Sequence, residues 1–541
     1  MGVAAILRPE VLRARPADDD ATRASPADYR PAIISTVVAA VLAGLYLLAP
    51  LTGQDTSAQL ARADFAYAHP TIPVDLRWFG GTLQFGYSLW APWLGGLIGS
   101  RLLGALAAVA GTWLGTRLIQ RAEPMRPLWG GIALAVCMVA DVAVGRITYQ
   151  CGLVCALAAA LVALNDRRAS AFVLAFLAGA ASPVATLGLW VYAVTGLATR
   201  RVGDAITLAV GSAAGTAIVS IYFADGADMT FPTESIVRAC VASTLVIVLL
   251  PVRHSLIKIG AAINLLVVIV AAAISSPVGS NAERLGLIFA IPLVAAFVEW
   301  RAWIAAIAVV LAVWAQPPVT SEIYSLAGVP ATHDSYYRPV IGAIEKHGRL
   351  TGRVEVPEIN GHWDAALLAE HVPEARGWLR QVDTKLNNGV FFKHPPTTAS
   401  YRAWLTKNAV QYVAVPDAKL TPSGRREKAL VLGGLPYLQR IWNNQHWTLY
   451  AVRGATTIVA APGRLASMDA ARIVLTAPRN KTVLIRIRWF RWTTVDTASG
   501  GCIAPSGDQV VLRTGTGRGT GRYVISSSVN PRQSSDDRGH C

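Results

Sequence analysis

Asp55 lies where a carboxylate could act as a general base. It follows a long apolar run at 32–51 (IISTVVAAVLAGLYLLAPLT) by a few residues. A carboxylate so close to an apolar phase is partly shielded from water, which suits it to accept a proton. Asp is also a preferred helix N-cap, and Asp55 could instead cap a helix that begins at Thr56. Both interpretations stay open on the residues alone.

Asp141 and Arg146 form a second candidate group. Asp141 lies inside an apolar segment near its end, and Arg146 follows just beyond that segment. Carboxylates within a membrane usually face a cavity or pair with a cation. The sequence therefore predicts either a substrate-cavity role for Asp141 or an Asp141–Arg146 ion pair that closes a helix end.

Glu283 and Arg284 stand in a short polar segment, SSPVGSNAERLG, between two apolar runs. The planar guanidinium of an Arg matches phosphate oxygens, so Arg284 at headgroup level could bind a lipid phosphate. The alternative is an ordinary snorkelling Arg. Glu283 is also a substrate-cavity candidate, as are Asp75 and Arg77 in the long polar loop 52–90. Asp75 and Arg77 could instead form a surface ion pair.

The sequence lacks the common nucleotide-binding and metal-binding motifs. It has no Walker A sequence, and the His residues lack metal-motif spacing such as HExxH. The sequence therefore requires no cofactor and predicts no metal site. A divalent cation would be compatible with the carboxylates, but no motif supports one.

The elements that must position these residues are apolar helices. Of 541 residues, 53% are hydrophobic and 15% charged, a balance that favours a membrane protein over a soluble enzyme. Spans of roughly 20 apolar residues, some of them shorter, are expected in about eleven places. They are 32–51, 98–117, 127–145, 150–165, 168–183, 184–199, 203–223, 236–251, 256–275, 285–299 and 302–316.

The distribution of Lys and Arg gives these spans an orientation. With a cytoplasmic N-terminus, Arg residues gather in alternate loops, as the positive-inside rule requires. An odd number of spans then places the C-terminal part outside the cell membrane. That part, 317–541, contributes +12 of the net charge of +16. Anionic lipids and glycans, and not nucleic acid, are the partners expected there.

The domain organisation follows from these runs. We expect a cytoplasmic disordered tail at 1–31, a transmembrane domain at 32–316, an extracytoplasmic α/β domain at 317–455, a small β-sandwich at 456–529 and a disordered tail at 530–541. Cys502 and Cys541 both lie on the outer side and could form a disulfide.

This layout resembles the C-type (GT-C) membrane glycosyltransferases that use polyprenyl-phosphate sugars. More narrowly, several segments look like a family of actinobacterial integral membrane proteins with this architecture. They are GRITYQCGLVCALAAALVAL, the ASPVA turn, GSNAERLGLIFAIPLVA, ARGWLRQVDTKLN and WLTKNAVQYVAVPD. The resemblance covers most of 32–452.

The resemblance implies an activity. GT-C enzymes have an acidic residue in the first outer loop, and Asp55 matches its place, so Asp55 would deprotonate an acceptor hydroxyl. Arg284 and Arg146 would neutralise the departing polyprenyl phosphate. The donor would be a polyprenyl-phosphate-linked sugar and the acceptor a cell-envelope glycan or lipid, which implies a hexosyl- or pentosyltransferase. The sequence departs from well-known members because Asp55 has no adjacent acidic partner and no WWD-type motif occurs.

Two other classes of function remain. A secondary transporter would explain many spans and Asp141, although such folds often contain repeated halves and no internal repeat is visible. A non-catalytic scaffold of envelope biogenesis would also fit, and it predicts that Asp55 and Arg284 tolerate replacement.

Overall fold

The computed structural model describes residues 29–50, 53–299, 314, 328–530 and 539–541. The chain divides into two compact units. One comprises Met1–Thr56 and Gly86–Ala327, and we call it the helical unit. The other comprises Ser57–Phe85 and Gly328–Cys541, and we call it the sheet unit.

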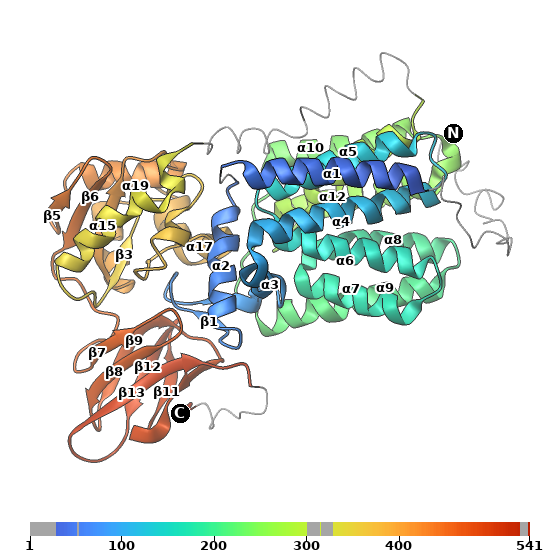
Figure 1. The fold of residues 1–541 in the computed structure, drawn as a ribbon. Coiled ribbons are helices and arrows are strands. Elements are labelled where there is room, and N and C mark those ends of the chain that lie inside the picture. Colours follow the sequence, from blue (N-terminus) through green and yellow to red (C-terminus); the bar gives the residue numbers. More distant parts are fainter. Residues whose placement is uncertain (1–28, 51–52, 300–313, 315–327, 531–538) are drawn as a thin grey trace. The chain divides into compact units, whose positions relative to one another are not determined.

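The helical unit consists of apolar helices that lie alongside one another (Figure 1). Their bounds are α1 (Arg30–Leu48), α3 (Ala91–Ile98), α4 (Ser100–Arg121), α5 (Pro127–Ala143), α6 (Ile147–Ala163), α7 (Arg168–Ala181), α8 (Leu187–Ala198), α9 (Val202–Ala217), α10 (Thr233–Leu249), α11 (Ser255–Ala273) and α12 (Glu283–Phe297).

The number of expected spans needs correction. Among the described residues, five helical segments are long and apolar enough to cross a membrane, not eleven. They are Arg30–Leu48, Ser100–Arg121, Val202–Tyr222, Val252–Ala273 and Gly279–Phe297. Segments such as α7 and α8 are helical as expected but have 14 and 12 residues. At about 1.5 Å per residue they are shorter than a hydrocarbon core of about 30 Å. The segment expected at 302–316 falls almost wholly outside the described residues, and the orientation stays a prediction.

Small residues let neighbouring helices approach closely. A Cβ on Gly215 of α9 would lie 2.1 Å from the carbonyl oxygen of Phe176 on α7, and one on Gly179 would lie 2.5 Å from that of Ser212. Such contacts place the two backbones against each other, the packing typical of helices in membranes.

The sheet unit contains the alternating helices and strands that the sequence predicts. Its mixed sheet has the order β3-β4-β6-β5, with β3 parallel to β4 and the other pairs antiparallel. The strands are β3 (Arg353–Glu355), β4 (Val410–Pro416), β5 (Leu438–Asn443) and β6 (Trp447–Val452). The accompanying helices are α15 (Asp334–Lys346), α16 (Asp364–Leu367), α17 (Arg380–Asn387), α18 (Thr398–Lys407) and α19 (Pro422–Leu432).

Two antiparallel sheets follow, with the orders β10-β13-β8-β7 and β11-β12-β9. Their strands are β7 (Arg464–Met468), β8 (Ile473–Pro478), β9 (Thr482–Arg488), β10 (Thr493–Val495), β11 (Gly501–Ser506), β12 (Gln509–Thr514) and β13 (Thr520–Ser527). Strand β9 alternates buried and less buried positions, with Val483, Ile485 and Ile487 in the core. This is the pattern of a sheet with one face packed.

The end of the chain differs from the expected disordered tail at 530–541. Residues 539–541 return to β11, where the backbone N–H of Cys541 donates to the carbonyl of Ile503. Cys541 is also disulfide-bonded to Cys502. A covalent link and backbone pairing thus order these last residues.

The long loop after the first apolar helix contributes to the sheet unit. It contains α2 (Thr56–Ala68) and the short strands β1 (Val74–Asp75) and β2 (Thr82–Leu83). Trp78 in this loop is fully buried, and its indole N–H donates to the carbonyl of Ala365. Residues 57–85 therefore pack with a part of the chain almost 300 positions away.

Candidate active site

The turn between α5 and α6 holds a buried ion pair. Arg146 Nη1 donates to Asp141 Oδ1 at 3.0 Å, and Gln150 Nε2 donates to Asp141 Oδ2 at 2.9 Å. Asp141 and Gln150 are buried. Gln150 lies one turn into α6, so the carboxylate receives a cation from the turn and an amide from the helix. This is the helix-end ion pair that the sequence left open as one alternative.

Asp55 lies against the same turn. Its backbone N–H donates to the carbonyl oxygen of Val144 at 3.3 Å. Gly145 has a φ of +96°, and a Cβ there would lie 2.4 Å from the backbone nitrogen of Thr56. Glycine is thus required both by the backbone angle and by the close approach. The turn thereby fixes the backbone of Asp55 beside Arg146.

Glu283 and Arg284 bring two more charges to this group, from the start of α12. Both side chains are buried. The guanidinium of Arg284 lies over the ring of Tyr149, 5.2 Å from its centroid, in a cation–π contact. The charges of Asp141, Asp55 and Glu283 all act on Arg146, and Oδ1 of Asp141 lies 3.0 Å from its Nη1. We call Asp55, Asp141, Arg146, Glu283 and Arg284 the charged cluster.

Several polar atoms of the charged cluster are buried without a partner in the described structure. They are Nε of Arg146, Nη1 of Arg284 and Oε2 of Glu283. Buried polar atoms are nearly always hydrogen-bonded in proteins, so unpartnered ones call for a ligand or water. The cluster therefore has donors and an acceptor available for a bound molecule.

Asp75 and Arg77 form an ion pair of their own. They belong to the sheet unit, whereas Asp55 belongs to the helical unit. The ion pair that the sequence left open is present, but both of its side chains are buried and do not lie at the surface. Arg77 donates from Nε and Nη2 to Asp75 and from Nη2 to the carbonyl of Ala61. The pair holds the loop to α2, which indicates a structural role.

Tyr149 and Gln150 are site residues that the sequence reasoning missed. Both follow Arg146 within one helical turn in the segment GRITYQ. Their spacing places them on the turn of α6 next to Arg146, which could have suggested a role. Polar and aromatic residues are common at helix starts, however, and neither stood out as a charge does.

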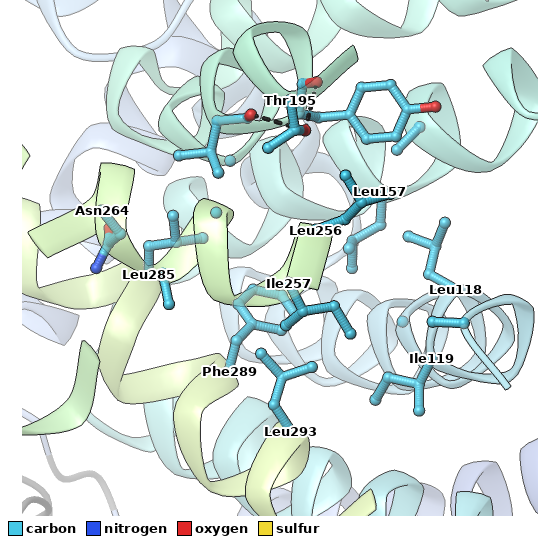
Figure 2. A pocket seen from close by; sticks show the side chains of 18 of the residues that line it. Leu118, Ile119, Leu157, Thr195, Leu256, Ile257, Asn264, Leu285, Phe289 and Leu293 are labelled. Atoms are coloured by element: carbon cyan, nitrogen blue, oxygen red, sulfur yellow. Dashed lines mark hydrogen bonds between the residues drawn. The ribbon is translucent and has the colours of Figure 1, made fainter. Parts of the chain in front are cut away.

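An apolar cavity lies in the same unit (Figure 2). It has a volume of about 730 Å³ and is lined by α4, α6, α8, α10, α11 and α12. Leu157, Ile257, Phe289 and Leu293 point into it. One polar contact in its wall is the hydrogen bond from Asn264 Nδ2 to Ser243 Oγ at 2.9 Å. Leu285 and Gly286 also line it, so its α12 wall begins directly after Arg284.

Metal ligands do not gather in the described residues: no group of three or more His, Cys, Asp and Glu side chains there could hold an ion.

The fold and the charged cluster together describe a chain with apolar helices, sheets and a group of charges at helix ends. The described chain has a unit of apolar helices, five of which could cross a membrane, and a unit with sheets. The charged cluster gathers at the starts of α6 and α12 and the end of α5.

Among solved structures, the chain is similar to the single-particle cryo-EM structure of the arabinofuranosyltransferase AftD from Mycobacteria. The identity is 11% and the TM-score 0.42, over 94% of this chain and 58% of that chain. Two structures of a mutant of AftD match with 12% identity and TM-scores of 0.43 and 0.44. The chain spans 58% to 60% of the length of these structures. No protein-family model and no curated protein matches the chain.

Proposed function

We propose that this chain is a membrane glycosyltransferase of the GT-C type, which moves a sugar from a polyprenyl-phosphate donor to a cell-envelope acceptor on the outer face of the membrane. The observation that carries the proposal is the charged cluster. It combines a half-buried carboxylate, Asp55, with the buried guanidinium of Arg284 and the partly buried guanidinium of Arg146, each of which has an unpartnered nitrogen atom.

Each residue of the cluster has a role in this reaction. Asp55 accepts the proton of an acceptor hydroxyl, and the hydroxyl oxygen forms a bond with the anomeric carbon of the donor sugar. The bond between that carbon and the phosphate oxygen breaks, and the phosphate leaves with the electron pair. Arg284 binds the leaving phosphate through its unpartnered Nη1. Arg146 adds positive charge, although Asp141 already pairs with its Nη1.

The apolar cavity supports a lipid donor. An isoprenoid chain has no polar groups, and the cavity wall along α12 continues directly from Arg284. A phosphate bound at Arg284 would place its hydrocarbon chain next to Leu285 and Phe289. Glu283 and Asp141 would line the polar end of the substrate site.

Two observations support an outer location for the sheet unit. The Cys502–Cys541 disulfide is typical of oxidising compartments. The excess positive charge of the C-terminal part would face anionic lipids and glycans.

The test is complementation of a strain that lacks the gene, with a profile of its lipids and envelope glycans. We expect a sugar to be missing in the deletion strain and restored by the wild-type chain. Asp55→Asn should accumulate in the membrane but fail to restore the sugar. The matched control is Asp228→Asn, which neutralises an exposed aspartate in a loop of the same unit and should restore it fully.

Other outcomes would favour another class. An unchanged glycan and lipid profile in the deletion strain would point to a transporter or a scaffold. Full restoration by Asp55→Asn would remove Asp55 from the base role.

A further inference from the structure

The apolar cavity of the helical unit has two arginines at one of its ends. Along α12 the cavity wall runs from Leu285, directly after Arg284, to Phe297, the last residue of the helix. At about 1.5 Å per residue this stretch is about 18 Å long. Arg121, the last residue of α4, and Arg201, between α8 and α9, also line the cavity. We call these two arginines the basic rim.

The basic rim lies at the opposite end of the helical unit from the charged cluster. Arg121 Nη2 donates to Oδ1 of Asn165 at 3.1 Å, and Arg201 Nη2 donates to the carbonyl oxygen of Ala163 at 3.3 Å. Helix α6 ends at Ala163, whereas the charged cluster lies at its start. Because α6 has 17 residues, its two ends are about 25 Å apart. The backbone N–H of Arg126, in the loop after α4, donates to the last turn of α12, so this helix also ends at the rim.

The two arginines of the basic rim differ in what neutralises them. Arg201 Nε lies 2.8 Å from Oδ2 of Asp204, and Arg201 Nη2 lies 3.4 Å from Oδ1 of Asp166. Arg121 is exposed, and its hydrogen bond to Asn165 involves a neutral amide. No carboxylate among the described residues pairs with Arg121. Its positive charge is therefore available to an anionic ligand.

The loops around the basic rim have an excess of positive charge. With the adjoining helix ends they are 121–126, 164–168, 199–204 and 250–258, which join α4 to α5, α6 to α7, α8 to α9 and α10 to α11. These segments contain eight Arg and Lys residues against three Asp and Glu residues, an excess of five positive charges. Basic pockets between transmembrane helices bind the headgroups of anionic lipids. In the orientation that the sequence predicts, these loops face the cytoplasm, where the leaflet contains anionic lipids.

Apolar side chains lie directly beside the basic rim. Leu118 and Ile119, within one turn of Arg121 on α4, point into the cavity (Figure 2). Leu256 and Ile257, in the first turn of α11, line it as well. A ligand that matches both parts needs an anionic group next to a hydrocarbon chain. A phospholipid has both, since its phosphate oxygens match the planar fork of a guanidinium and its acyl chains match the apolar wall.

We propose that the rim end of the cavity binds one anionic phospholipid of the membrane, with its phosphate on Arg121 and an acyl chain inside the cavity. The polyprenyl-phosphate donor of the proposed function is not the occupant of the rim, because its phosphate has to reach the charged cluster at the other end of α6 to react. The phospholipid site is therefore separate from the candidate active site. It does not depend on the transferase activity.

Lipid binding to the purified full-length protein in detergent tests this site. Native mass spectrometry measures the affinity for dipalmitoyl phosphatidylglycerol, which is anionic, and for dipalmitoyl phosphatidylcholine, which has the same chains and no net charge. We expect one phosphatidylglycerol to bind more tightly than phosphatidylcholine. Arg121→Gln should weaken phosphatidylglycerol binding about fivefold, the effect of one positive charge near a headgroup. Arg121→Lys keeps the charge and should lose less. As the matched control, Arg440→Gln neutralises an exposed arginine on β5 of the sheet unit and should bind like the wild type.

A second pair of variants tests whether the acyl chain enters the cavity. Ala261 of α11 lines the cavity, so Ala261→Trp fills part of it without a change of charge. We expect this variant to bind both phospholipids more weakly. Ala262, the next residue, is exposed and lies outside the cavity wall. Ala262→Trp is therefore the matched control and should bind like the wild type. Melting temperatures of the variants check that each of them is folded.

The possible results separate this proposal from its alternatives. Equal affinity of the wild type for the two phospholipids, or wild-type affinity of Arg121→Gln for phosphatidylglycerol, would contradict the site. Equal binding by Ala261→Trp and Ala262→Trp would place the lipid on the surface outside the cavity. If Arg121→Gln weakened the binding of a polyprenyl phosphate as much as that of phosphatidylglycerol, the rim would belong to the donor. Because the assay measures no sugar transfer, failure of the lipid site and failure of the proposed transferase function are separate results.

Discussion

At the scale of single residues, the two arginines of the charged cluster differ in what already neutralises them. Arg146 has an ion pair with Asp141, which Gln150 also contacts. Arg284 lies on the ring of Tyr149 and has a buried nitrogen without a partner in the described structure. Arg284 is therefore the better candidate for phosphate binding, and Arg146 holds the α5–α6 turn.

Replacement of Arg284 should show whether activity depends on the positive charge of its side chain or on the planar shape of the guanidinium. We expect Arg284→Gln to abolish activity in the complementation assay. Arg284→Lys should keep only a small part of it, because an ammonium group lacks the planar fork and the stacking of a guanidinium. Tyr149→Phe keeps the ring and should retain activity. Equal activity of the Lys variant and the wild type would mean that charge alone matters at this position.

The sequence predicted the charged residues of the cluster more readily than their neighbours. Asp141, Glu283 and Arg284 stood out because charges beside apolar runs are rare. Tyr149 did not, since its role depends on the contact between its ring and Arg284 at the start of α12. The sequence did not show that Asp75 and Arg77 belong to the sheet unit, because nothing in a loop sequence indicates which unit the loop joins.

At the scale of elements, the α5–α6 turn positions the candidate site. Gly145 allows the backbone to turn with a positive φ and lets Asp55 approach. Apolar patterning predicted α5 and α6 but not this approach. Patterning also overestimated helix length, as at α8. A turn at Pro183–Thr186 precedes this helix, and Arg200, with a φ of +63°, follows it. Helix bounds depend on such local backbone conformations, which average hydropathy does not contain.

Gly145→Ala should therefore damage both folding and activity. A Cβ would clash with the backbone of Thr56, and a positive φ is unfavourable for alanine. We expect a destabilisation of about 1–3 kcal/mol, measured as a lower melting temperature of the purified protein. As the control, Gly44→Ala adds a methyl group in α1 where no atom lies within 4 Å. It should be neutral or stabilising, since alanine favours helix formation. A normal melting temperature for Gly145→Ala would show that the turn can relax.

At the scale of the whole molecule, the loop 57–85 packs with a part of the chain that is distant in sequence, 328–541. The sequence predicted where apolar helices give way to strands near 317, because composition changes there. It could not predict that residues 57–85 belong with 328–541, since that grouping depends on contacts across nearly 300 residues. Trp78 makes one of these contacts, and its ring packs on the backbone of Gly377.

Trp78→Ala should therefore weaken the sheet unit while it leaves the helical unit intact. Removing a fully buried Trp costs about 3–5 kcal/mol, because it leaves a cavity and here also an unpaired carbonyl at Ala365. We expect faster hydrogen–deuterium exchange in peptides that cover 361–382, and unchanged exchange in α4 and α5. The control is Trp93→Ala, which truncates a 43% exposed Trp in α3 of the helical unit and should leave peptides 361–382 unaffected. If Trp78→Ala left those peptides fully protected, the loop would contribute no stability to the sheet unit, and the grouping of 57–85 with 328–541 would have no energetic basis.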